Sequence, residues 1–193
     1  ARNMERFAQH FAGDPHIVVP KVYWALTNPT INVQDFVDGI PAMRLDLAEA
    51  AGLDRKLLAR RGADAVLKMI LLDGLFHADP HPGNVFFLAE NRIVFIDFGM
   101  VGRLSRDRRD QLADLLSALS RRDERGVYDV LIDWTGSAQV DDDGLKADIA
   151  EFLFQYDGLS LSELDLTQLI NDIMALMREH SIVLPADLSM LFK

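Results

Sequence analysis

The chain has 193 residues, of which 49% are hydrophobic and 26% are charged, as is typical of a soluble globular domain or a large lobe of a bigger protein. A net charge of −10 argues against a general nucleic-acid-binding protein, since such proteins need a basic face to neutralise phosphates. Cysteine is absent, which excludes disulfides and thiolate sites, and no apolar run approaches the roughly 18–20 residues that cross a bilayer.

The N-terminal segment predicts one helix and two short strands. Met4, Phe7 and Phe11 recur at helical spacing, so a helix is expected over residues 4–11. Residues 17–25 and 31–37 are rich in β-branched and aromatic side chains and are expected to form two strands joined by a turn.

The middle of the chain predicts a long helix followed by a β-hairpin. Residues 54–75 are amphipathic at helical spacing and are stopped by Gly74. Residues 85–88 and 93–96 are apolar runs separated by a four-residue turn, and both strands are apolar enough to be largely buried.

The remaining residues indicate a helical bundle. Helices are expected over residues 105–119, 124–134, 143–156 and 166–180, with a last helix starting at Pro185. The predicted fold class is therefore α+β and mostly helical, with a few strands beside the bundle.

The loop between the long helix and the hairpin carries the chemistry. Residues 76–84 (FHADPHPGN) contain two prolines and a glycine, which forbid a helix and favour a rigid loop. This loop supplies Asp79 and Asn84, and Asp97 ends the second strand of the hairpin. Because a hairpin brings the start of its first strand beside the end of its second, Asn84 and Asp97 are expected to converge.

Such a donor set suits phosphoryl transfer. One carboxylate and one amide oxygen are hard ligands for Mg²⁺, which completes its shell with water and phosphate oxygens. Asp79 lies outside that pair, where it can orient or deprotonate an acceptor. The five-residue step from Asp79 to Asn84, followed by DFG at residues 97–99, matches the spacing of the protein-kinase motifs.

The motifs also resemble those of one family. FHADPHPGN at residues 76–84 and DFGMVGRL at residues 97–104 are similar to the hallmark motifs of the UbiB (aarF-domain) atypical kinase family. Residues 31–40 are similar to its strand-and-hinge segment, and residues 160–184 to its C-terminal helical region. The resemblance implies the C-lobe, with hinge strands, of a protein-kinase-like fold.

The same resemblance implies roles for individual residues. Asn84 and Asp97 are then metal ligands, Asp79 holds the catalytic-base position, and Gln34 and Phe36 join Asn84 and Asp97 in binding the nucleotide. The implied cofactors are ATP and Mg²⁺. The implied function is an atypical kinase or ATPase that supports isoprenoid quinone (ubiquinone) biosynthesis. The short segment between Asp97 and the helix expected from residue 105 leaves no room to bind a polypeptide, which favours a lipid or small-molecule substrate.

The resemblance also implies how the chain is organised. Residues 1–40 would end the N-lobe and form the hinge, residues 41–104 would hold the catalytic loop and DFG region, and residues 105–193 would be the helical C-lobe. The remaining N-lobe elements would precede Ala1, so residues 1–193 alone are expected to be inactive. A cytoplasmic location, peripheral to or anchored at the inner membrane through segments outside this chain, and a homodimer are further expectations.

Other interpretations of the residues remain open. A small-molecule phosphotransferase of the aminoglycoside or choline kinase type carries a similar HPGN run but usually lacks the GMVGRL continuation at residues 99–104. A pseudokinase-like module that binds nucleotide and lipid without turnover is the non-enzymatic alternative. A zinc site at His77 and His81 is disfavoured, because prolines at 80 and 82 exclude the helix that would aim both rings together.

Overall fold

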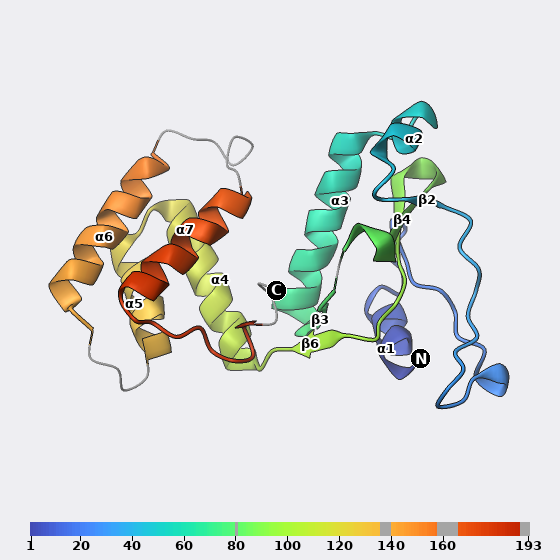
Figure 1. The fold of residues 1–193 in the computed structure, drawn as a ribbon, viewed down its shortest axis with the longest axis horizontal. Helices are drawn as coiled ribbons and strands as arrows, with labels where there is room; N and C mark the ends of the chain where they lie inside the picture. Colours follow the sequence, from blue (N-terminus) through green and yellow to red (C-terminus); the bar gives the residue numbers. More distant parts are fainter. Residues whose placement is uncertain (80, 136–139, 158–165, 190–193) are drawn as a thin grey trace. The chain divides into compact units, whose positions relative to one another are not determined.

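The structure is a computed structural model that describes residues 1–79, 81–135, 140–157 and 166–189. The described chain divides into two compact units, residues 1–105 and residues 106–189, each of which has its own core. Figure 1 shows strands and helices mixed in the first unit and helices alone in the second. The mostly helical α+β class expected from the sequence is confirmed.

The first unit opens with helix α1 (Arg2–His10), which buries Met4 and Phe7. These two residues are three apart and therefore lie on one face of the helix, next to Phe11, which is also buried. The helix expected over residues 4–11 is confirmed, with an earlier start.

A four-stranded sheet forms around the predicted hairpin. Its order is β1 (Ile17–Val18), β5 (Arg92–Phe95), β4 (Val85–Leu88) and β2 (Ile40–Pro41). Strand β1 runs parallel to β5, whereas β4 is antiparallel to both of its neighbours. The turn η4 (Ala89–Asn91) closes the hairpin with positive φ angles at Glu90 and Asn91. The hairpin is therefore confirmed.

The prediction of two strands over residues 17–25 and 31–37 is wrong in their extent. Only Ile17–Val18 is a regular strand there, and residues 24–26 form the short 3₁₀ helix η1 (Trp24–Leu26). One isolated antiparallel bridge joins Val22 to Gln34. Ile17 and Val22 are buried, but Trp24, Leu26 and Ile31 are exposed and Phe36 is 91% exposed, so no continuous buried face favours longer strands.

Helix α2 (Leu45–Ala50) precedes the long helix, and the long helix changes its winding near its end. Asp54 caps α3 (Arg55–Leu67) by accepting bonds from the backbone N–H groups of Lys56 and Leu57. The helix continues as the π-helical segment η2 (Lys68–Asp73) and stops at Gly74, whose φ is 62°. The expected stop at Gly74 is confirmed. Strand β3 (Leu75–His77) follows and pairs antiparallel with β6 (Val101–Arg103).

The described part of the second unit contains four helices. They are α4 (Arg106–Arg121), α5 (Glu124–Thr135), α6 (Asp142–Gln155) and α7 (Leu166–Glu179). Leu131, Leu145 and Ile149 are fully buried in this bundle. All four helices were predicted. The segment after Pro185 makes one turn, in which Leu188 and Ser189 donate to the Pro185 carbonyl, and the rest of the expected last helix lies outside the described residues.

Within the described ranges, no helix combines the length and the apolar character that a membrane crossing requires.

Candidate phosphoryl-transfer site

The hairpin places Asn84 and Asp97 at the same end of two paired strands. Val85 of β4 lies opposite Phe95 of β5, and the Ile96 N–H donates to the Asn84 carbonyl at 2.9 Å. Asn84 therefore accepts this backbone bond, and Asp97 directly follows the residue that donates it. This is the neighbourhood that the sequence pattern predicted.

Asn84 is positioned by a bond to the backbone of Asp79. Asn84 is only 8% exposed and is the last residue of the 3₁₀ turn η3 (Pro82–Asn84). Its Nδ2 donates to the Asp79 carbonyl at 3.1 Å. The amide nitrogen thus donates to the backbone, so Oδ1 is the atom of this side chain that can coordinate a metal ion. The bond also fixes Asp79 and Asn84 relative to each other.

Asp97 has a strained backbone. Its φ of 27° lies in the left-handed region, where a non-glycine residue costs on the order of 1–2 kcal/mol. Its Oδ1 accepts a bond from the Gly99 N–H at 3.0 Å, and the residue is exposed while Phe98 is buried. The strain and the turn together present the carboxylate to solvent and send the next side chain into the core.

Phe98 connects this turn to helix α1. Its ring centroid lies 4.6 Å from that of Phe7 and 5.2 Å from that of His77, and its carbonyl accepts a bond from Asn3 Nδ2 at 3.0 Å. Sequence reasoning missed Asn3 and Phe7 as contributors to the site. Their four-residue spacing on one helix face was the available signal, although it does not identify the partner.

The loop that carries Asp79 is braced by two histidines. His77 is 5% exposed, and its Nδ1 accepts a bond from the Asp79 N–H at 3.1 Å. Burial lowers the pKa of His77, and the charges of Asp79 and Asp97 offset this only in part, so the ring is neutral at pH 7. His81 Nδ1 accepts from the Gly83 N–H at 2.9 Å, and its Nε2 lies 3.9 Å from Asp79 Oδ2.

Strands β3 and β6 hold the two halves of the site together. His77 lies opposite Val101, and the Ala78 N–H donates to the Met100 carbonyl at 3.1 Å. A Cβ on Gly102 would lie 2.0 Å from the Phe76 ring, so a side chain at this position would force the buried ring to shift. The close pairing fixes the segment before Asp79 beside the segment after Asp97.

Gln34 and Phe36 stand apart from these three residues. Gln34 is half-buried and accepts a bond from Asn32 Nδ2 at 2.8 Å, while Phe36 is largely exposed. Among the described residues, no hydrogen bond or ion pair joins either side chain to Asp79, Asn84 or Asp97. The same segment reaches the hairpin at β2, where Ile40 pairs with Phe87.

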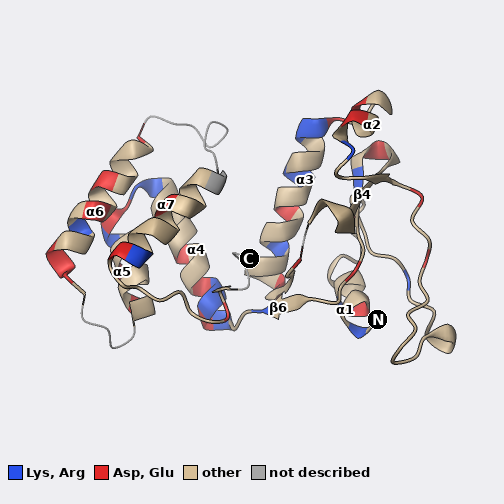
Figure 2. Cartoon of the chain, in the orientation of Figure 1, with Lys and Arg blue, Asp and Glu red and all other residues tan. Residues whose placement is uncertain are grey.

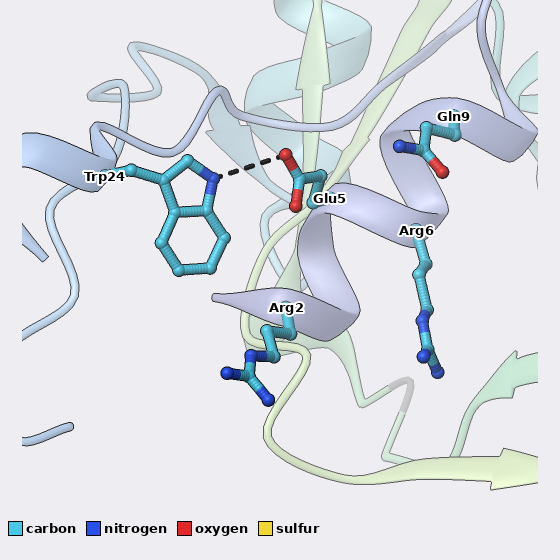
Figure 3. Close-up of a pocket in the computed structure, with 5 residues that line it drawn as sticks. All are labelled: Arg2, Glu5, Arg6, Gln9 and Trp24. Atoms are coloured by element: carbon cyan, nitrogen blue, oxygen red, sulfur yellow. Dashed lines mark hydrogen bonds between the residues drawn. The ribbon is translucent and has the colours of Figure 1, made fainter. Parts of the chain in front are cut away.

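A separate hollow lies on the exposed face of α1. It has a volume of about 440 Å³ and is lined by Arg2, Glu5, Arg6, Gln9 and Trp24. Figure 3 shows the Trp24 indole N–H directed at Glu5, a bond of 3.2 Å, with both arginines extending away from it. Neither the catalytic loop nor the turn at Asp97 contributes to its lining.

Sequence comparison assigns most of the chain. The profile of the ABC1 atypical kinase-like domain matches residues 1–131, and that of the UbiB helical domain matches residues 149–193. The protein slr0889 of Synechocystis is 34% identical over 188 residues, which cover 93% of this chain and 46% of that protein. The chloroplastic protein ACTIVITY OF BC1 COMPLEX KINASE 1 of Arabidopsis thaliana is 40% identical over 114 residues, which cover 59% of this chain and 17% of that protein. The chain thus spans less than half the length of these curated relatives.

A solved structure shares the fold. The complex of Rv3197 with erythromycin from Mycobacterium tuberculosis superposes with a TM-score of 0.51 at 20% identity, covering 91% of this chain and 52% of that one. At this identity the likeness supports the fold alone.

Proposed function

The chain belongs to the ABC1/UbiB family of atypical kinase-like proteins, and we propose that it forms the metal- and phosphate-binding part of a phosphotransferase or ATPase that uses Mg-ATP. In this proposal residues 1–40 serve as the end of the N-lobe and the hinge, residues 41–104 hold the catalytic loop and DFG region, and residues 105–193 form the helical C-lobe.

One observation carries the proposal. The hairpin brings Asn84 and Asp97 to adjacent strand ends, and the bond from Asn84 Nδ2 to the Asp79 carbonyl ties the third residue to them. The residues that carry the two carboxylates and the amide oxygen are up to 18 positions apart in the sequence, and these contacts support their acting together.

These side chains suit Mg²⁺ better than they suit a metal ion whose ligands are all protein side chains. Within the described ranges, no three His, Asp or Glu side chains gather as a metal site. Asn84 Oδ1 and the Asp97 carboxylate supply two hard oxygen donors, and Mg²⁺ accepts water and phosphate oxygens for the rest. When bound, the ion would neutralise charge on the phosphates.

Asp79 is assigned a different role, since its side chain is not part of the donor pair. Its backbone is held from both sides, by His77 Nδ1 and by Asn84 Nδ2. The carboxylate is about half exposed and can accept a proton from an acceptor hydroxyl or orient a water molecule.

The segment after Asp97 favours a small acceptor. Only residues 98–105 separate Asp97 from α4, and three of them are paired as β6 with β3. That leaves no long segment to bind a polypeptide substrate, which protein kinases place after DFG. We therefore propose a lipid or small-molecule acceptor, in support of isoprenoid quinone biosynthesis near a membrane, with Gln34 and Phe36 on the nucleotide side of the hinge.

Nucleotide titration of the full-length protein tests the metal site. Asp97→Asn keeps the acceptor for the Gly99 N–H but removes the charge, so Mg²⁺-dependent ATP affinity should fall by roughly 100-fold or more, on the scale of a charge-assisted contact. Asn84→Ala should weaken affinity less. Asp64→Asn, an exposed carboxylate on α3, is the matched control and should bind like the wild type. Unchanged Mg-ATP affinity in Asp97→Asn would refute the assignment.

A further inference from the structure

The π-helical segment η2 builds an ion pair that an ordinary helix would not make. Lys68 begins this segment and Asp73 ends it. In an α-helix, side chains three or four apart are neighbours, whereas π-helical bonds join residues five apart. The change of winding therefore places these two residues, five apart, on one face. Lys68 Nζ donates to Asp73 Oδ1 at 2.9 Å and to Oδ2 at 2.7 Å.

The same ammonium group also holds helix α1. Lys68 Nζ donates to the His10 carbonyl at 2.8 Å and lies 4.8 Å from the centroid of the Phe11 ring. An ammonium has three donors, and the three acceptor oxygens here use all of them. Asp73 is 13% exposed, and its Oδ2 also lies 3.5 Å from His10 Nδ1. The end of α1 and the end of η2 are thus joined through one partly buried charge.

Both joined elements lead directly to the candidate site. Nearer the start of α1, Asn3 and Phe7 contact Phe98, the residue after Asp97. After η2, Gly74 leads into β3, which ends at His77 and continues to Asp79. The Lys68 contact thus fixes α1, which packs on the residue after Asp97, to the helix that precedes the catalytic loop.

We propose that Lys68 is a positioning residue that holds α1 against the segment leading into the catalytic loop, and thereby keeps Phe98 and Asp97 in place. The consequence for turnover depends on the proposed phosphoryl-transfer function. The positional effect does not, because it acts on the backbone of α1 and of residues 97–99 with or without a nucleotide.

Hydrogen exchange of the full-length protein measures the positional effect without ATP. In Lys68→Met, amides of α1 and of residues 97–99 should exchange roughly tenfold faster or more, since hydrogen bonds to charged groups contribute on that scale. Amides of β4, β5 and the helices of residues 106–189 should keep their wild-type rates. Lys56→Met removes an exposed lysine from α3 and is the matched control.

A second variant separates the loss of the clamp from the burial of an unpaired carboxylate. Lys68→Met combined with Asp73→Asn leaves no unpaired charge and should still accelerate exchange in α1, whereas Lys68→Arg, which can donate to the same oxygens, should restore much of the protection. Wild-type exchange of α1 in the double variant, or equal acceleration in α1, β4 and β5, would overturn the proposal.

Steady-state kinetics then tests the link to catalysis. Lys68→Met should lower kcat about tenfold or more while the affinity for Mg-ATP changes by less, because the ligands themselves remain. If the wild type shows no Mg-ATP turnover, the proposed function fails while the exchange result stands. If the wild type turns over and Lys68→Met matches it, the positioning role fails.

Discussion

Residues 1–105 and residues 106–189 use charge in different ways. The first region carries 11 Lys and Arg against 12 Asp and Glu, whereas the second carries 8 against 18, so nearly all of the net charge of −10 belongs to the second. Figure 2 shows acidic positions distributed over α4–α7. The candidate site lies in the first, nearly neutral region. A triphosphate and its metal would need local donors there rather than a charged surface.

The two regions also differ in what they bury. Among the described residues, the buried polar side chains are His77 and Asn84, and both belong to the first region. Left-handed φ angles at non-glycine residues do not separate the regions, because they occur at Asp97 in the first and at Arg122 and Ser181 in the second. The helical region instead buries apolar side chains at regular helical spacing. Buried polar groups cost free energy, so their concentration in the first region indicates where chemistry rather than stability determined the residues.

The largest expected effect comes from a residue of the first region and concerns turnover by the full-length protein. Asp79→Asn should lower kcat about 10²–10⁴-fold, the usual contribution of a positioned base, with little change in nucleotide affinity. The backbone bonds of residue 79 to His77 and Asn84 survive this change, which isolates the carboxylate. Steady-state kinetics and nucleotide titration of the full-length protein measure both effects, and equal kcat values would contradict the assignment.

A core truncation should affect the second region through stability. Leu131→Ala removes a fully buried side chain of α5 and should lower the free energy of unfolding by about 2–5 kcal/mol. Phe154→Ala is the control, since this ring is 77% exposed and should shift stability by less than about 0.5 kcal/mol. Chemical denaturation followed by circular dichroism measures both variants, and similar midpoints would argue against the described core.

Glycine substitutions test the close pairing of β3 with β6. Gly102→Ala places a Cβ 2.0 Å from the Phe76 ring and should destabilise by about 1–3 kcal/mol. Gly62→Ala on α3 meets only Ile93 Cδ1, at 3.7 Å, and should be neutral or stabilise by up to about 1 kcal/mol. Thermal unfolding compares the two, and a tolerated Gly102→Ala would show that Phe76 packs elsewhere.

The smallest effect is the pH dependence that His77 contributes. Burial lowers the pKa of His77 in the folded state below the value of about 6.5 in the unfolded state. Below that pH the unfolded state therefore binds more protons, so the free energy of unfolding falls as pH decreases toward the folded pKa. His77→Asn lacks this contribution, and its stability relative to the wild type should improve between pH 7.5 and pH 5.5. Denaturation without metal measures the difference, with His81→Asn as the exposed control.

Local sequence patterns were enough to predict much of this fold. The hairpin, the helix stop at Gly74 and the four helices of the second region follow from spacing and turn residues that act over a few positions. The meeting of Asn84 with Asp97 also followed from sequence, because a short hairpin fixes which residues flank it. The strands near residue 22 were overestimated, because propensity does not reveal that Phe36 and Ile31 are exposed.

Tertiary structure alone decided how helix α1 takes part in the site. Asn3 and Phe98 are 95 positions apart, and no spacing rule relates them. Lys68 and Asp73 are five apart, a separation that pairs only once the helix widens to π winding, and the His10 carbonyl that Lys68 also binds is 58 positions away. The sequence by itself determined the chemical groups and their local turns, because those depend on neighbouring residues. The contacts that hold them in one place depend on packing between distant segments, which the chain acquires only when it folds.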